Sequence, residues 1–197
     1  KILYFQEGID TTVAITSGSE NHIALRVNGK ADASNGVGDM NTQYLLGHIP
    51  LFVKPDAKDI CVIGWGSGMT VGAILEHSVK NVDVVEISSE VIEASKYFDT
   101  YNNSAIDNSK VNVFINDGRN FLFLEDKKYD IIVSEPSNPW ISGIANLFSR
   151  EFFELSKNRL KPGGIHCQWI HSYSMSINNF FSIINTVAAS FKYIQLW

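Results

Sequence analysis

The chain has 197 residues, 45% of them hydrophobic and 12% aromatic, which is enough to bury the core of one domain with a small appendage. Its net charge of −5 argues against nucleic acid as the main partner, because a phosphate-binding surface needs clustered Lys and Arg. No apolar run reaches the roughly 20 residues that span a bilayer, and no signal-peptide pattern is present, so we expect a cytoplasmic chain.

The first 38 residues predict a small antiparallel β lobe. Three short runs of β-forming residues are separated by turn formers: residues 3–5, 12–15 and 23–27. Asn28-Gly29 follows the third run and is a typical hairpin signal, since both residue types tolerate positive φ. Residues 33–38 are rich in turn formers, so they are the predicted linker to a second unit over residues 39–197.

From Asp39 onward, helical and strand patterns alternate. Asp39 is predicted to cap a helix that ends near Gly47, ahead of Pro50. Apolar runs predict strands at residues 60–63, 82–85, 111–115, 131–133 and 165–170. Helical patterns lie between them, at residues 69–77, 89–98, around 121 and 147–160. Strict alternation implies a doubly wound, mostly parallel sheet that binds ligands at the carboxyl ends of its strands.

The cysteines, the histidines and the chain ends carry weaker signals. Cys61 and Cys167 lie in apolar runs that predict interior strands, so we expect core residues in a reducing compartment, without a disulfide. The five histidines lack ligand spacing, and no metal site is predicted. The chain starts at Lys1 rather than Met and stops in a strand-like run, 191–197, so we expect a piece of a longer protein.

A glycine-rich loop is the most informative motif. Gly64-Trp65-Gly66-Ser67-Gly68 follows one predicted strand, and Glu86 ends the next. Backbone N–H groups in such a turn face a ligand, and the carboxylate can accept hydrogen bonds from two ribose hydroxyls. The dinucleotide fingerprint needs a further glycine where Met69 stands, which favours a sulfonium nucleoside such as S-adenosylmethionine over a pyrophosphate. A tight turn without a ligand is the alternative.

Acidic residues end three successive predicted strands, namely Glu86, Asp117 and Glu135, and such strand ends meet at one crevice. Asp117 is placed to accept from an adenine amino group or to cap the following helix, and both roles can coexist. Glu135 opens a stiff loop with two prolines and an exposed Trp140. Burial there would raise its pKa and let it take a proton from a nucleophile; the alternative is a carboxylate that caps the loop backbone.

Together these motifs resemble the spermidine synthase (polyamine aminopropyltransferase) family. The resemblance rests on residues 47–51, 64–68, 84–87, 116–120 and 129–136, and it extends to the N-terminal lobe. It implies an S-adenosylmethionine-dependent methyltransferase-like Rossmann fold and a co-substrate that is decarboxylated S-adenosylmethionine or S-adenosylmethionine. The acceptor would be a small amine such as putrescine, and we expect a homodimer. The Glu-Pro-Ser-Asn-Pro-Trp loop, 135–140, resembles a divergent bacterial subgroup in which this domain is often fused to membrane-spanning segments.

The predicted site residues form three groups. Glu135 is the predicted catalytic base. The predicted cofactor-binding residues are Gly64, Gly66, Ser67, Gly68, Glu86, Ile87, Asp117, Gly118 and Ser134. The predicted acceptor-binding residues are Asp32, Thr42, Gln43 and Asn138.

Several of these positions depart from the family pattern. Ser67 and Asn138 stand where the family usually has Asp, Thr42 where it has Tyr, and Asp32 where it has Gln. A polyamine pocket uses carboxylates to offset the desolvation of each ammonium, so putrescine is expected to be a poor acceptor unless Asp32 points inward. Three functions therefore stay open: aminopropyl transfer, methylation of a small molecule, and nucleoside binding without catalysis.

Overall fold

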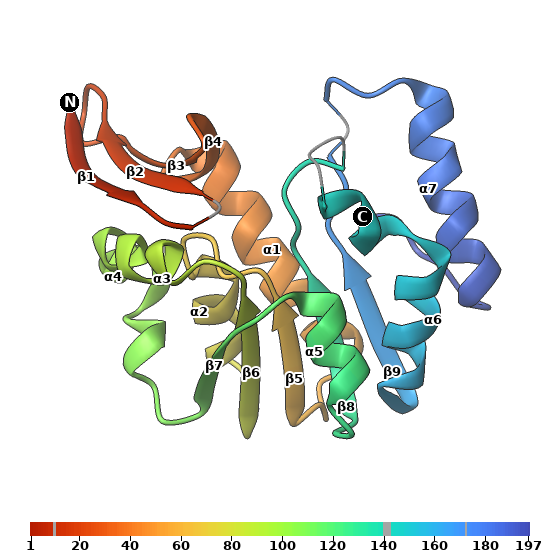
Figure 1. Cartoon of the computed structure of the whole chain (residues 1–197). Helices are drawn as coiled ribbons and strands as arrows, with labels where there is room; N and C mark the ends of the chain where they lie inside the picture. Colours follow the sequence, from red (N-terminus) through yellow and green to blue (C-terminus); the bar gives the residue numbers. More distant parts are fainter. Residues whose placement is uncertain (10, 140–142, 172) are drawn as a thin grey trace.

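The structure is a computed structural model that describes residues 1–9, 11–139, 143–171 and 173–197, and it contains two β-sheets (Figure 1). The smaller sheet is antiparallel, in the order β1-β2-β3-β4. Its strands are β1 (Ile2–Glu7), β2 (Thr12–Ser17), β3 (Ile23–Val27) and β4 (Lys30–Ser34). Asn28 and Gly29 join β3 to β4 with φ values of 51° and 81°, as the hairpin signal predicts.

The larger sheet has five parallel strands in the order β7-β6-β5-β8-β9. They are β5 (Asp59–Ile63), β6 (Asn81–Glu86), β7 (Val111–Ile115), β8 (Tyr129–Ser134) and β9 (Leu160–Gln168). Alternate residues of β5 face opposite layers: Ile60 and Val62 pack into one buried cluster, Cys61 and Ile63 into the other. Burial on both faces explains the continuous apolar run. The predicted doubly wound parallel sheet is confirmed.

Helices cover both faces of this sheet. They are α1 (Val37–Val53), α2 (Met69–Leu75), α3 (Ser89–Ser95), α4 (Asp99–Asn102), α5 (Gly118–Leu124), α6 (Arg150–Asn158) and α7 (Ile177–Ser190). Side chains of α1, α2 and α3 pack into the cluster around Ile60, and those of α5, α6 and α7 into the cluster around Cys61. None of the helices in the described ranges is long and apolar enough to cross a membrane.

Helix α1 differs from its prediction at both ends. It begins after Gly36, so Asp39 lies in the first turn and is not the cap. It also continues through Pro50 instead of ending near Gly47. A proline removes one backbone hydrogen bond, but tertiary packing compensates, because α1 and α2 touch at Gly47. A Cβ at Gly47 would lie only 2.6 Å from the carbonyl oxygen of Thr70.

Other predicted elements differ in extent. The helix predicted at 89–98 divides into α3 and a 3₁₀ turn, and the helix predicted at 147–160 is shortened to α6 behind another 3₁₀ turn, Ile144–Phe148. The run 191–197 forms no strand within the described chain, because α7 ends at Ser190 and no strand pairs with the residues that follow. Helix α7 itself was not predicted.

The N-terminal sheet lies beyond the carboxyl ends of the parallel strands. These ends are marked by the arrowheads of β5 and β9 in Figure 1. Side-chain hydrogen bonds tie this lobe to the helical segments beside it, and two of them involve tyrosines. Tyr97 donates its hydroxyl to the Leu3 carbonyl oxygen at 3.1 Å, and the Asn35 amide donates to the Tyr101 hydroxyl at 2.9 Å. The lobe and the strand ends therefore enclose a common space.

Candidate active site

A cavity of about 1300 Å³ occupies this space, which is enough for a nucleoside and a second small molecule. Ten of the predicted site residues line it: Asp32, Thr42, Gln43, Gly64, Gly66, Glu86, Ile87, Asp117, Gly118 and Glu135. Topology thus brings together residues from both sheets and from α1. Four predicted residues do not line it: Ser67, Gly68, Ser134 and Asn138.

The glycine loop needs its glycines for backbone reasons. Gly64, Gly66 and Gly68 have φ values of 96°, 54° and 78°, a region that favours glycine. A Cβ at Gly64 would lie 2.7 Å from the carbonyl oxygen of Glu135, so the two loops touch only because no side chain intervenes. A Cβ at Gly66 would meet nothing within 4 Å, since this position opens onto the cavity.

Ser67 is buried behind the loop instead of facing a ligand. Its hydroxyl donates to the side-chain oxygen of Gln43, and its carbonyl oxygen accepts from the Asn102 amide at 2.8 Å. Ser67 therefore fastens the loop to α1, while Gln43 itself lines the cavity. Trp65 is also buried and packs into the core.

Glu86 ends β6 and is held by backbone donors on both carboxylate oxygens. The N–H of Trp65 donates to Oε2 at 2.9 Å, and the N–H of Ser88 donates to Oε1 at 3.0 Å. Burial raises the pKa of Glu86, while these N–H groups lower it. The two bonds fix the orientation of the carboxylate at the cavity wall, and lone pairs remain for two adjacent ligand hydroxyls.

Asp117 follows β7 and caps α5. Its Oδ1 accepts from the N–H of Asn120 at 2.8 Å, so the predicted capping role is confirmed. This bond uses one oxygen of a residue that lines the cavity, which leaves Oδ2 for a ligand. The adenine assignment stays a prediction.

Glu135 follows β8 beside the glycine loop, where its N–H donates to the Ile63 carbonyl oxygen at 2.9 Å. Burial raises the pKa of the Glu135 carboxyl to about 8; the charges of Asp39 and Glu86 act in the same direction, and the Thr70 hydroxyl opposes them. A carboxyl with this pKa can take a proton from an amine near neutral pH, and a cationic ligand would favour its ionised form. Trp140, predicted to be exposed in this loop, lies outside the described residues.

The cavity wall also holds an ion pair that was not predicted. Lys30 pairs with Asp32, and its ammonium also donates to the Ser137 hydroxyl oxygen at 3.0 Å. Ser137 in turn donates to Asp32 at 2.9 Å. Asp32 lines the cavity as predicted, but it does not supply a free negative charge. The contact with Ser137 could not be predicted from local sequence, because Lys30 and Ser137 lie 107 positions apart.

The remaining acceptor-side predictions have different outcomes. The Thr42 hydroxyl donates to the Asp39 carbonyl oxygen at 2.7 Å, so it offers the cavity only acceptor lone pairs. Asn138 is fully buried, and neither its amide nitrogen nor its amide oxygen has a hydrogen-bond partner among the described residues. Binding roles for both residues stay predictions.

Four described residues after β9 line the cavity and were not predicted as site residues: Trp169, Ile170, His171 and Tyr173. The Trp169 indole N–H donates to Nε2 of His171 at 3.2 Å, and the Tyr173 ring stands edge-on to the imidazole at 5.1 Å. Because an indole N–H only donates, the imidazole proton lies on Nδ1. Burial lowers the pKa of His171 to about 4, so it is neutral at physiological pH. The position of His171 shortly after the end of a predicted strand was the one sequence feature that indicated a place in the site.

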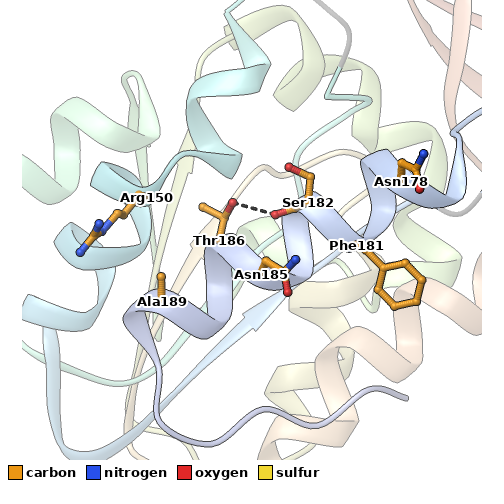
Figure 2. Close-up of a pocket in the computed structure, with 7 residues that line it drawn as sticks. All are labelled: Arg150, Asn178, Phe181, Ser182, Asn185, Thr186 and Ala189. Carbon is orange, nitrogen blue, oxygen red and sulfur yellow. Dashed lines mark hydrogen bonds between the residues drawn. The ribbon is translucent and has the colours of Figure 1, made fainter.

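Two further observations concern metal ligands and a second hollow. Within the described ranges, no group of three or more His, Cys, Asp or Glu residues could hold a metal ion. A second hollow beside α6 and α7 shares no residue with the cavity (Figure 2). Its described lining has no carboxylate, histidine or cysteine: Arg150, Asn178, Phe181, Ser182, Asn185, Thr186 and Ala189.

Known proteins resemble this chain in sequence and in fold. The spermidine synthase of Dictyostelium discoideum is 37% identical over 135 residues, which cover 66% of this chain and 47% of that protein. Putrescine N-methyltransferase 2 of Nicotiana attenuata is 30% identical over 156 residues, which cover 76% of this chain and 42% of that protein. The chain thus spans less than half the length of these curated relatives.

A crystal structure of a spermidine synthase in complex with the transition-state analogue AdoDATO has the same fold, with a TM-score of 0.90 and 20% identity. The superposition covers 98% of this chain and 66% of that one. The sequence also matches the spermine/spermidine synthase domain over residues 40–196, which is most of its length. The chain therefore belongs to the spermine/spermidine synthase family.

Proposed function

We propose that the chain transfers an aminopropyl group from decarboxylated S-adenosylmethionine to a small amine. The observation that carries this proposal is the position of Glu135, with a pKa raised to about 8, in the same cavity as the glycine loop and Glu86. Family membership supports it, because the Dictyostelium relative is named a spermidine synthase.

In the proposed mechanism, Glu86 accepts hydrogen bonds from the ribose hydroxyls and Asp117 from the adenine amino group. The neutral amine nitrogen attacks the methylene carbon beside the sulfonium. The C–N bond forms as the C–S bond breaks, its electron pair goes to sulfur, and methylthioadenosine leaves. Glu135 takes the proton that the new ammonium releases. Alignment of two bound substrates supplies most of the rate enhancement.

Calorimetric titration with methylthioadenosine, S-adenosylmethionine and its decarboxylated form tests the nucleoside site. Product analysis with putrescine and other amines then tests the transfer, with Glu135→Gln as the matched variant, since glutamine keeps the shape but cannot accept the proton. Formation of an aminopropyl product by the wild type and its loss in the variant are expected. Nucleoside binding without any product would indicate a binding module instead.

Methylation of a small molecule is the second candidate. A relative named putrescine N-methyltransferase matches 76% of this chain, and Ser67, where the family usually has Asp, is turned away from the cavity. Incubation with S-adenosylmethionine and mass analysis of the amine would reveal a gain of one methyl group in place of the aminopropyl group.

A homodimer, a cytoplasmic location and fusion to membrane-spanning segments are further proposals. They rest on the family resemblance of the sequence. Light scattering on purified protein tests the first, because a dimer would have twice the mass of the chain.

A further inference from the structure

We propose that Lys30 binds a carboxylate carried by one of the two small molecules in the cavity, so that the site recognises an amino-carboxylate group. This inference rests on the proposed function, because it concerns ligands of the same site. Lys30 is the sole Lys or Arg among the described lining residues. A cation at this position is unexpected in a pocket for diamines, since it repels a second ammonium.

The geometry of Lys30 leaves it able to bind a ligand. An ammonium has three N–H donors, of which Asp32 and Ser137 accept two. The Lys30 side chain keeps 33% of its surface exposed, and the residue lines the cavity. A third donor is therefore available to an anionic group.

Among the described residues, Asp32 is the one carboxylate that forms an ion pair with Lys30. Burial lowers the pKa of His171, Lys30 is close enough for its charge to act in the same direction, and the imidazole is neutral with the proton on Nδ1. Glu86 is held by the backbone N–H groups of Trp65 and Ser88, and the charge of Asp32 adds to burial in raising the pKa of its carboxyl. Asp32 shares its Oδ1 between Lys30 and Ser137, so its charge is largely compensated.

Further carboxylates in the cavity are available to a ligand ammonium. Asp39 lines the cavity, accepts only the Ser34 hydroxyl at 2.8 Å among the described side chains, and lies close enough to Glu135 to raise its pKa. The cavity thus offers carboxylates on α1 and after β8, and an ammonium on β4. The third donor of Lys30 and these carboxylates together complement a ligand that carries both an ammonium and a carboxylate.

Two ligands could supply the carboxylate. One source is the donor, since S-adenosylmethionine retains the amino-carboxylate that its decarboxylated form has lost. The other source is the acceptor, which would then be an amino acid with a free amine. The chemistry at Lys30 is the same in both cases.

The experiment compares the wild type with Lys30→Met and with Lys30→Arg, which keeps the charge. Calorimetry measures binding of methylthioadenosine, S-adenosylmethionine and decarboxylated S-adenosylmethionine. Initial rates with 4-aminobutyrate and with putrescine measure acceptor use. Lys30→Met should lower the affinity for the carboxylate-bearing ligand about tenfold or more, as expected for a charged hydrogen bond, and leave the affinity for methylthioadenosine unchanged. Lys30→Arg should largely retain that affinity, and Asp32→Asn should raise it by removing the competing anion.

The outcomes separate the possible explanations. Selective weakening of S-adenosylmethionine identifies the donor as the source, and a selective rise in KM for 4-aminobutyrate identifies the acceptor. Equal weakening of all ligands would overturn the proposal and show that Lys30 only holds the Ser137 loop. Unchanged binding of every ligand would overturn it too. A wild type that fails to bind methylthioadenosine would contradict the proposed function, and the S-adenosylmethionine and 4-aminobutyrate titrations would still decide the role of Lys30.

Discussion

Replacement of Glu135 by Gln should stabilise the chain at alkaline pH while it removes the proposed catalytic base. Burial raises the pKa of this carboxyl from 4.5 to about 8. Between these values the folded chain keeps a proton that the unfolded chain has released. The folded state binds more protons, so the free energy of unfolding falls as pH rises through this window.

The size of the effect follows from the two pKa values. At about 1.4 kcal/mol per pKa unit, the difference between 4.5 and about 8 corresponds to at most about 5 kcal/mol. Water that enters the cavity reduces this value, so we expect Glu135→Gln to be about 2–5 kcal/mol more stable than the wild type near pH 9. The two proteins should differ little near pH 4, where both side chains are uncharged.

Urea denaturation at several pH values measures this difference. Glu7→Gln, at an exposed position on β1, controls for the loss of one negative charge. In the same series, methylthioadenosine release by the wild type should increase as pH rises toward about 8, where Glu135 ionises, and Glu135→Gln should be nearly inactive. Parallel curves of unfolding free energy against pH for wild type and Glu135→Gln would refute the argument that burial sets the pKa of this residue.

Three further changes test the nucleoside end of the cavity. Gly66→Val should abolish methylthioadenosine binding, because the valine side chain would enter the cavity. The control is Gly163→Val, which has a similar φ of 71° and open surroundings and should lose only stability. A Gly66→Val protein that still binds methylthioadenosine in calorimetry would contradict this. Asp117→Ala should lower the free energy of unfolding by about 1 kcal/mol, because it removes the helix cap. Asp117→Asn should keep the cap and lose affinity for the nucleoside. Equal nucleoside affinity in the wild type and both variants would limit Asp117 to capping. Glu86→Ala should weaken methylthioadenosine binding by about 1.5–3 kcal/mol, and unchanged affinity would disprove the ribose assignment.

The parts of the site that the sequence predicted are those that follow from strand topology. Glu86, Asp117 and Glu135 each lie at the end of a strand or within two residues of it, and parallel strands place such residues at one edge of a sheet. The continuous apolar run of β5 indicated burial on both faces. These inferences need only local periodicity and the general rule for parallel sheets.

The parts that could not be predicted depend on contacts between distant segments. The Lys30–Ser137 contact crosses 107 positions, and the wall formed by His171 depends on where the chain turns after β9. Helix α1 passes through Pro50 because α2 packs against it, which overrides the local preference to stop. Periodicity contains no information about such contacts.

The structure changes the interpretation of the positions that depart from the family pattern. Ser67 and Asn138 stand where the family usually has Asp, but both are fully buried and neither lines the cavity. An aspartate at either position would be desolvated without a cationic partner among the described residues, which costs stability and adds no charge to the cavity wall. Asp32 adds a carboxylate where the family usually has Gln, but this carboxylate is paired with Lys30. Acceptor selectivity therefore depends on the hydrogen-bonding capacity that the Lys30–Asp32 pair leaves to a ligand, and the third N–H donor of Lys30 makes it the position at which a change of substrate class is most directly tested.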